Sequence, residues 1–251
     1  MRVAALYDIH GNLRALEAVL AEVAKYRPDR ILVGGDVALG PMPREVLEVL
    51  AGLGNRVLYL RGNCDREMVS ALRSDAAGLP AWGARTRWAA ERCTSSQIEL
   101  LSTLPTTQVL DIDGMGPTLF CHGSPRSDSE ILTRITAGHR LRAALGDTRQ
   151  RVVVSGHTHV QYDRTVSGVR WVNPGSVGMA YARVRGAYWA TFGPGVALRN
   201  TAYDVERAVA DVRASGFPEG DEFVEKYLRH APDPTEATVF FEGLAEGSTV
   251  E

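Results

Sequence analysis

The stretch RVAALYDIHGN, residues 2–12, decides the fold because an apolar run leads directly into polar residues and a glycine. Residues 2–7 predict a buried strand, and apolar residues then recur at helical spacing until Pro28 ends the helix. The same order returns as a strand, a helix and a further strand, at residues 31–33, 46–53 and 57–60. Strands that alternate with helices indicate βαβ units, a mostly parallel sheet and an α/β fold.

Strand signals return in the second half of the chain, where short β-branched and aromatic runs are joined by turns that contain glycine. These runs lie at residues 107–113, 117–121, 151–155, 160–166, 169–172, 187–192 and 196–202. They predict hairpins and a second sheet.

The chain length of 251 residues is that of one large domain with small additions. We expect this domain to span residues 1–230. A helix-rich stretch at 66–105 predicts a small helical cap inserted into it, and residues 204–230 predict two C-terminal helices. Residues 231–251, which are rich in proline and acidic residues, predict a flexible tail.

Composition excludes several classes of protein. The chain is 45% hydrophobic and 23% charged, which is enough apolar material for a full core. Its 28 Lys and Arg balance 30 Asp and Glu, so we expect neither a membrane surface nor a long nucleic acid as partner. The three cysteines form no paired framework, and no secretory signal opens the chain, which favours the cytoplasm. The sequence does not decide between a monomer and a homo-oligomer.

Polar clusters flanked by glycine follow five of the predicted strands. The clusters are Asp8-Ile9-His10-Gly11-Asn12, Gly34-Gly35-Asp36, Gly62-Asn63-Cys64-Asp65, Cys121-His122-Gly123 and Ser155-Gly156-His157-Thr158-His159. Ligands of open α/β sheets bind outside the carboxyl ends of the strands, so we expect these clusters to meet. Each cluster alone is compatible with a helix cap, a turn or a core histidine. Their joint occurrence, which takes up four of the six histidines, favours a site.

The donors in these clusters are the oxygen and imidazole groups that divalent transition metals accept. The seven candidate ligands are Asp8, His10, Asp36, Asn63, His122, His157 and His159. Seven donors exceed the four or so protein ligands of a single tetrahedral ion, so two ions are predicted. Asp36 is suited to bridge them because a carboxylate can bind through both oxygens.

The motifs D-x-H, G-D, G-N-x-D, H-G and G-H-T-H occur in the order that resembles the calcineurin-like metallophosphoesterase superfamily. The run GDVALGP at residues 35–41 resembles its small bacterial and archaeal phosphodiesterase branch, as does the turn at 173–178. The resemblance implies a four-layer αββα sandwich, in which two mixed β-sheets are flanked by helices and carry a dinuclear site at their shared edge.

The resemblance also implies roles for the ligands. Asp8, His10, Asp36 and His159 would hold one metal, and Asp36, Asn63, His122 and His157 the other. Two divalent ions are implied, with manganese first and iron, zinc, nickel or cobalt as alternatives. A metal-bridging hydroxide would attack the phosphorus, with Asp36, Asn63 and His122 as the catalytic ligands.

The implied activity is that of a phosphodiesterase for a small nucleotide or a similar ester. A phosphomonoesterase, a dinucleoside polyphosphate hydrolase and a non-catalytic metal-binding scaffold are the alternatives. Many members of the superfamily carry a histidine, thought to protonate the leaving group, where this chain has Cys64. Arg126, Arg183 and Arg185 are candidate phosphate contacts, although the sequence favours ordinary surface arginines over that role.

Overall fold

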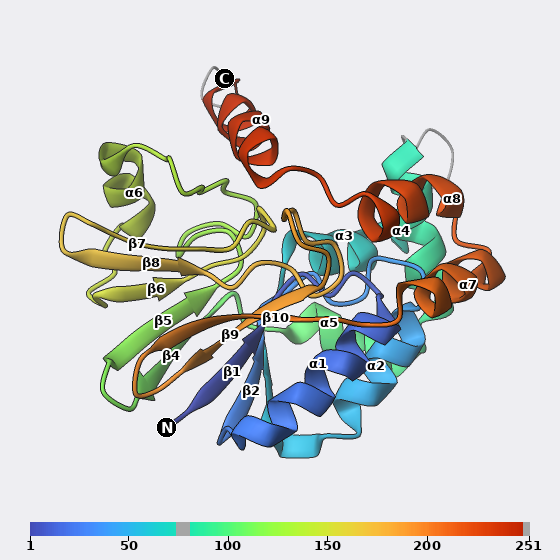
Figure 1. Ribbon diagram of the computed structural model, residues 1–251, viewed down its shortest axis with the longest axis horizontal. Coiled ribbons are helices and arrows are strands. Elements are labelled where there is room, and N and C mark those ends of the chain that lie inside the picture. The colour runs from blue at the N-terminus through green and yellow to red at the C-terminus, as the bar shows by residue number, and fades with distance from the viewer. Residues whose placement is uncertain (74–80, 248–251) are drawn as a thin grey trace.

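The computed structural model describes residues 1–73 and 81–247 and shows two mixed five-stranded sheets packed face to face (Figure 1). The first sheet has the order β10-β9-β1-β2-β3. Its strands are β1 Val3–Leu6, β2 Arg30–Val33, β3 Val57–Tyr59, β9 Ala187–Phe192 and β10 Val196–Thr201. Strands β1, β2 and β3 are parallel, whereas β9 runs antiparallel to both β1 and β10. The hairpin β9–β10 therefore returns from the end of the chain to the first sheet.

The second sheet has the order β4-β5-β6-β8-β7. Its strands are β4 Thr107–Ile112, β5 Gly116–Cys121, β6 Val152–Val154, β7 Tyr162–Val166 and β8 Val169–Asn173. Strands β5, β6 and β8 are parallel, and β4 and β7 close the two edges in antiparallel hairpins. All ten strands fall within or next to the predicted runs.

The alternation of side chains along β1 explains how the layers are joined. Val3, Ala5 and Tyr7 face the second sheet, where they pack with residues such as Phe120 and Val172 in the core between the sheets. The intervening Ala4 and Leu6 face the opposite way and pack in the core beneath helices α1 (Leu13–Tyr26) and α2 (Pro43–Ala51). Because successive residues of a strand point to opposite faces, one apolar run serves both cores.

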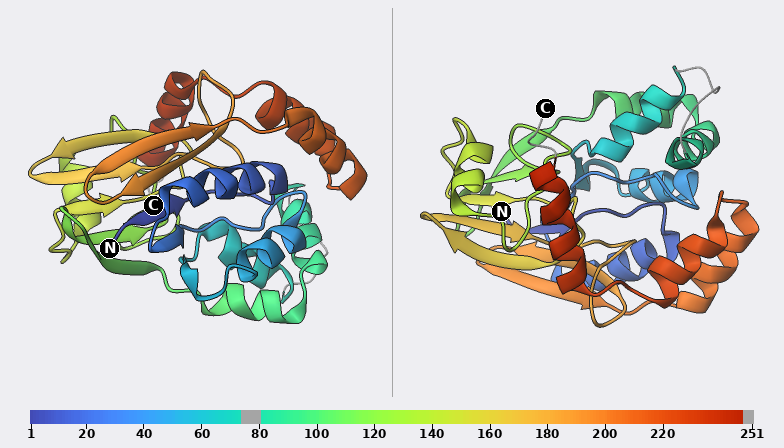
Figure 2. Two further views of the ribbon diagram at one scale, coloured as in Figure 1. Left: turned by 60° about the horizontal axis from the view of Figure 1, so that its bottom comes forward. Right: turned by 90° about the horizontal axis from the view of Figure 1, so that it is seen from above.

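Helix α6 (Gly138–Leu145) completes the sandwich on the outer face of the second sheet. Its Leu141 and Ala144 pack against Val153 and Trp171 of that sheet. The two views of Figure 2 show α1 and α2 on one side of the sheets and α6 on the other. The predicted four-layer α/β sandwich is therefore confirmed.

The stretch after β3 is helical, as predicted for the cap. It contains α3 (Asn63–Ala71), α4 (Ala81–Arg92) and α5 (Ser95–Thr103), while residues 74–80 of the predicted cap lie outside the described residues. After β10 come α7 (Val205–Ser215), the short α8 (Gly220–Phe223) and a π-helical turn at Val224–Arg229. Their apolar side chains form a small core of their own, which includes Val209, Phe217 and Leu228.

The flexible tail predicted at 231–251 is wrong for most of that segment, which forms helix α9 (Pro234–Gly247); residues 248–251 lie outside the described residues. The proline and acidic residues begin a helix here. Pro234 occupies the first turn, where its missing N–H is tolerated, and Asp233 accepts hydrogen bonds from the backbone N–H groups of Thr235 and Glu236.

None of the helices within residues 1–73 and 81–247 combines the length and the apolar character that crossing a membrane requires.

Candidate metal centre

Five of the seven predicted ligands have a left-handed backbone conformation. Asp8, His10, Asp36, His157 and His159 have φ angles between 47° and 66°. Such conformations are sparsely populated outside glycine, and a residue held in one costs about 1–3 kcal/mol. Asp8 lies two residues after the end of β1, and Asp36 lies three residues after the end of β2. The chain therefore turns sharply close to the end of each strand. These turns bring the five side chains to one edge of the sandwich.

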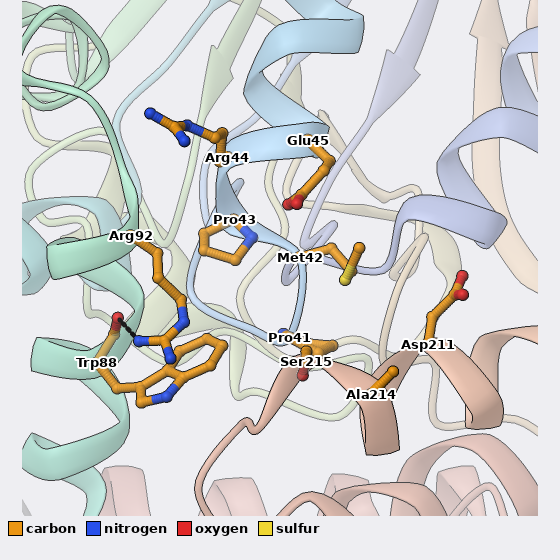
Figure 3. A pocket seen from close by; sticks show the side chains of 10 residues that line it. All are labelled: Pro41, Met42, Pro43, Arg44, Glu45, Trp88, Arg92, Asp211, Ala214 and Ser215. Atoms are coloured by element: carbon orange, nitrogen blue, oxygen red, sulfur yellow. Dashed lines mark hydrogen bonds between the residues drawn. The ribbon is translucent and has the colours of Figure 1, made fainter.

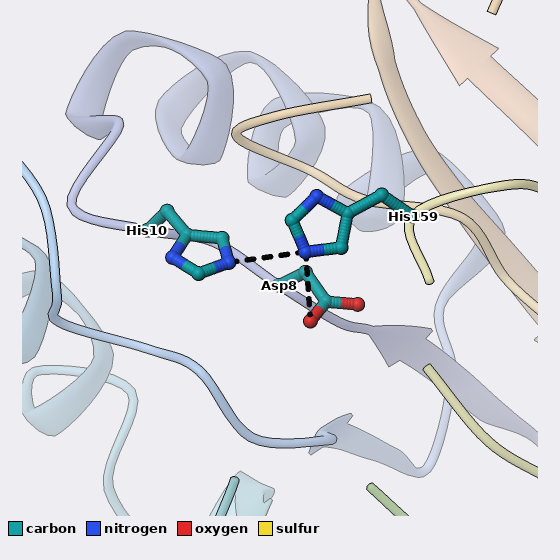
Figure 4. A group of neighbouring side chains, drawn as sticks. All are labelled: Asp8, His10 and His159. Atoms are coloured by element: carbon teal, nitrogen blue, oxygen red, sulfur yellow. Dashed lines mark hydrogen bonds and ion pairs between the residues drawn. The ribbon is translucent and has the colours of Figure 1, made fainter. Parts of the chain in front are cut away.

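The first group of donors consists of Asp8, His10 and His159 (Figure 4). The Nε2 atoms of His10 and His159 are 3.2 Å apart, and Nε2 of His159 is 3.4 Å from Oδ1 of Asp8. The donor atoms of the three residues all lie within 4.8 Å of one another. Two loops separated by about 150 positions thus supply a single cluster of the size that one ion requires.

The second group consists of Asp36, His122 and His157. Nε2 of His122 is 3.3 Å from Oδ2 of Asp36 and 3.8 Å from Oδ1 of Asp8. Oδ2 of Asp36 is also 3.8 Å from Nε2 of His10, which belongs to the first group. Asp36 therefore lies between the two groups, in the place expected of a bridging carboxylate.

Backbone carbonyl groups orient three of the imidazoles. Nδ1 of His10 is 3.1 Å from the carbonyl oxygen of Leu39, that of His122 is 2.8 Å from Gly34 and that of His159 is 2.9 Å from Met179. A hydrogen bond from Nδ1–H places a proton on that nitrogen and directs Nε2 toward the centre of the site, where it can bind a metal once it has lost its own proton. Metal-binding histidines commonly have this arrangement.

Unpartnered polar atoms test whether these residues fit a metal. Oδ1 of Asp8, Oδ1 of Asn63 and Nε2 of His122 are buried and have no hydrogen-bond partner in the described part of the chain. Leaving a buried polar atom unpaired costs about 1–3 kcal/mol, and three such atoms on predicted ligands are unusual in a packed interior. Cations bound by the two groups would satisfy all three atoms, so the residues fit a metal centre.

Electrostatics support the same interpretation. Burial raises the pKa of Asp8, but His159 and His122 outweigh it and lower that pKa overall. Burial lowers the pKa of His122, but the carboxylates of Asp36 and Asp8 raise it to about 10. Burial and then His122 lower the pKa of His157 to about 4. The negative charges of Asp8 and Asp36 favour the protonated form of His122, as they would favour a bound cation. Binding of a metal would release that proton.

Asp65 supports the site, and sequence reasoning gave it no role. Its carboxylate accepts hydrogen bonds from the backbone N–H groups of Asp36, Val37 and Gly62, at 2.9, 3.0 and 2.9 Å. It thereby ties the loop after β2 to the start of α3. Burial and the charge of Asp36 raise the pKa of Asp65 to about 7. The signal that could have revealed it is its place three residues after Gly62, where a side chain can cap the first turn of a helix.

Glu67 and the turn at 173–178 make hydrogen bonds that orient the predicted ligands or the loops that carry them. Glu67 accepts a hydrogen bond from Nδ2 of Asn63 at 3.4 Å, which turns Oδ1 of Asn63 the other way. In the predicted turn at 173–178, Asn173 donates to the carbonyl oxygen of Gly156 at 2.8 Å, and Ser176 donates to that of Asp8 at 2.7 Å. The turn thus fixes the backbone of two ligand loops.

Gly62 is required by close approach to Asp36. A Cβ atom at position 62 would lie 2.1 Å from Oδ1 of Asp36 and 2.5 Å from its backbone nitrogen. We expect Gly62→Ala to displace Asp36 and to weaken metal binding at least tenfold, since ligand placement decides affinity. Gly195→Ala is the control for an added methyl group, because no atom lies within 4 Å of a Cβ there and its backbone is not in the left-handed region. Metal titration of both variants would measure the effect, and equal affinities would contradict the role given to Gly62.

Two of the three arginines predicted to contact phosphate form ion pairs with carboxylates, and the third is exposed to solvent. Arg126 forms an ion pair with Glu130, and Arg183 lies 3.4 Å from Asp233 before α9. Arg185 is exposed and lines a cavity with Tyr203 and Val205. Cys64, in contrast, lies in the site, because its sulfur is within 4.8 Å of donor atoms of His10 and Asp36.

A separate cavity of about 380 Å³ lies between the start of α2, helix α4 and helix α7 (Figure 3). Arg92 lies over the ring of Trp88 there, 3.4 Å from its centroid, and donates to the Trp88 carbonyl oxygen. Glu45 and Asp211 balance Arg44 and Arg92 along its walls. The described residues that line this cavity include none of the predicted metal ligands.

Comparison with known proteins gives the class that this fold and site define. The sequence matches the calcineurin-like phosphoesterase superfamily domain over residues 1–192, and the chain belongs to this superfamily. The fold is similar to that of a metallophosphoesterase from Sphaerobacter thermophilus, with a TM-score of 0.71 and 28% identity over 90% of this chain and 97% of that one.

Two archaeal proteins are also similar. The solved structure of a hypothetical protein from Pyrococcus horikoshii has a TM-score of 0.77 at 23% identity, and the match covers 90% of this chain and 98% of that one. An uncharacterized protein of Methanocaldococcus jannaschii is 24% identical over 238 residues, which is 86% of this chain and 94% of that protein.

Proposed function

We propose that the protein is a dinuclear metal-dependent phosphodiesterase that hydrolyses a small nucleotide or a similar ester. The observation that carries this proposal is the meeting of two contiguous donor groups around Asp36, together with the unpartnered buried atoms of Asp8, Asn63 and His122. Membership of the calcineurin-like phosphoesterase superfamily supports hydrolysis of a phosphoester. Manganese is the proposed metal, with iron, zinc, nickel or cobalt as alternatives.

The proposed ligand sets follow the two groups. Asp8, His10, Asp36 and His159 would hold one ion, and Asp36, Asn63, His122 and His157 the other. When bound, the two ions supply an activated water and neutralise the oxygens of the phosphoryl group. The chain orients the donors through the carbonyl groups of Leu39, Gly34 and Met179. Asp65 and the turn at 173–178 fix the loops that carry them, and the proposal needs no covalent phosphoenzyme.

A screen of esters on the manganese-loaded protein tests the proposal. Aryl phosphodiesters should be hydrolysed faster than aryl phosphomonoesters, alkyl diesters or dinucleoside polyphosphates. Faster hydrolysis of the monoester or of the anhydride would favour the corresponding alternative enzyme. Metal binding without hydrolysis of any ester would favour the scaffold. A variant without Asp36, assayed in parallel, subtracts the background of contaminating phosphatases.

Cys64 sets the expected preference for leaving groups. Burial and the charge of Asp36 raise the pKa of the Cys64 thiol well above its ordinary value, so the thiol is a poor proton donor to a departing oxygen. We expect Cys64→His to raise the ratio of monoesterase to diesterase rates, because imidazole titrates near neutral pH. Cys64→Ser, a small hydroxyl of similar shape, is the control and should leave the ratio unchanged. An unaltered ratio in Cys64→His would contradict this role.

A further inference from the structure

Tyr181 packs directly against one of the predicted metal ligands. The ring of Tyr181 lies 5.2 Å from the imidazole of His159, centroid to centroid, with 28° between the planes. The backbone N–H of Tyr181 also donates to the carbonyl oxygen of His159 at 3.3 Å. Nδ1 of His159 is held by the Met179 carbonyl, so the imidazole is fixed both at its edge and on its face. Both contacts restrict rotation of a ring whose Nε2 must meet the metal.

Tyr181 is in turn held by side chains from the end of the chain. Its ring is 6.3 Å from that of Tyr227 and 5.9 Å from that of Phe241, with interplanar angles of 32° in both pairs. Tyr227 belongs to the π-helical turn, and Phe241 belongs to α9. A row of aromatic rings therefore connects the C-terminal helix to His159.

Helix α9 is docked by a polar contact as well. Glu242 accepts hydrogen bonds from the hydroxyl groups of Thr133, at 2.6 Å, and Thr136, and it pairs with Arg140 at 2.7 Å. These three residues lie in the segment that follows the His122 loop. In Figures 1 and 2, α9 is a separate helix joined to the rest by an extended segment, so these contacts decide where it rests. The outer side of α9 faces away from these contacts, since Phe240 is 62% exposed and Val239 is 61% exposed.

We propose that Tyr181 is a positioning residue for His159 and that α9, through Phe241, holds Tyr181 in place. The affinity of the first donor group, which contains His159, for a metal ion therefore depends on the docking of the C-terminal helix. Outer partners that orient a metal ligand typically change metal affinity by about 10–100-fold when they are removed. The inference rests on the metal centre of the proposed function, but it concerns metal binding and not the reaction.

The test is calorimetric titration of the full-length, metal-free protein with manganese, in the absence of any ester. Tyr181→Ala should weaken one class of site about 10–100-fold, whereas Tyr181→Phe should bind like the wild type because the stacked ring remains. Phe241→Ala should weaken the same class of site by a smaller factor. Val239→Ala removes apolar atoms from the exposed side of the same helix, away from this row of rings, and should have no effect.

A spectroscopic measurement separates positioning from general destabilisation. In the metal-free protein, loss of the stacked ring should shift the His159 ring resonances in Tyr181→Ala and, by less, in Phe241→Ala. The His122 resonances should stay in place. If Tyr181→Ala fails to fold, Glu242→Ala gives a second route, since release of α9 should reproduce the Phe241→Ala result. Wild-type affinity in Tyr181→Ala or Phe241→Ala, or equal losses in Val239→Ala and Phe241→Ala, would overturn the inference. If manganese binds as expected but no ester is cleaved, the proposed function fails and this inference stands.

Discussion

Replacing Asp36 by alanine is expected to abolish both metal binding and ester hydrolysis. Oδ2 of Asp36 lies 3.3 Å from Nε2 of His122 and 3.8 Å from Nε2 of His10, so its loss removes a ligand from both donor groups at once. The residue is 2% exposed, and burial alone would raise the pKa of its carboxyl group; His122, His10 and His157 reverse that effect and keep the carboxylate ionised. No water could replace its negative charge between two cations.

The metal content of dialysed protein and the rate of diester hydrolysis measure this prediction separately. Asp36→Asn is the informative partner variant. Its amide oxygen can still accept the hydrogen bond that the Cys64 N–H now gives to Oδ1 at 2.9 Å, so the local structure is kept while the charge is lost. Asp147→Ala, at an exposed position, is the control. Retention of both metal and activity in Asp36→Ala would end the dinuclear proposal.

Replacing Asp65 by alanine is expected to cause the largest loss of stability. The carboxylate is fully buried and accepts hydrogen bonds from three backbone N–H groups, those of Asp36, Val37 and Gly62. Each buried donor left without an acceptor costs about 1–3 kcal/mol, so the free energy of unfolding should fall by about 3–9 kcal/mol. For a chain of this size, the melting temperature should fall by roughly 10 °C or more.

Asp65→Asn should lose less, because its single amide oxygen can still accept the N–H groups of Asp36 and Gly62, both of which now bond to Oδ2. Thermal unfolding of both variants, with and without manganese, gives the comparison. Asp147→Ala again serves as the control for loss of a carboxylate at an exposed site. A melting temperature of Asp65→Ala equal to that of the control would show that the loops after β2 and β3 do not depend on this residue.

The parts of the fold with strong local periodicity could be predicted from the sequence. The runs at 187–192 and 196–202 correspond to β9 and β10 almost residue for residue. The pairing of β9 with β1 could not be predicted, since it joins positions nearly 190 residues apart and no local pattern encodes such a partner. Helix α6 was missed because its short sequence presents only Leu141 and Ala144 to the core.

The site divides in a similar way. The clustering of the candidate ligands could be predicted because aspartate, asparagine and histidine beside glycine at strand ends have few structural explanations when they occur together. The supporting residues could not, because Asp65, Glu67 and Tyr181 act through contacts with distant segments. Helix α9 was mistaken for a tail because Pro234 and acidic residues mark a helix start as well as a loop.

The left-handed turns at the ligands have a consequence for how such a protein can change over time. Conformational strain at Asp8, His10, Asp36, His157 and His159 is already present in the folded chain before any ion arrives, so capture of the ion need not reshape the backbone. The same strain is relieved when a ligand is replaced by glycine, which adopts these angles freely. A related protein in which these metal ligands have been replaced by glycine can thus gain conformational stability at the same positions where it loses the metal.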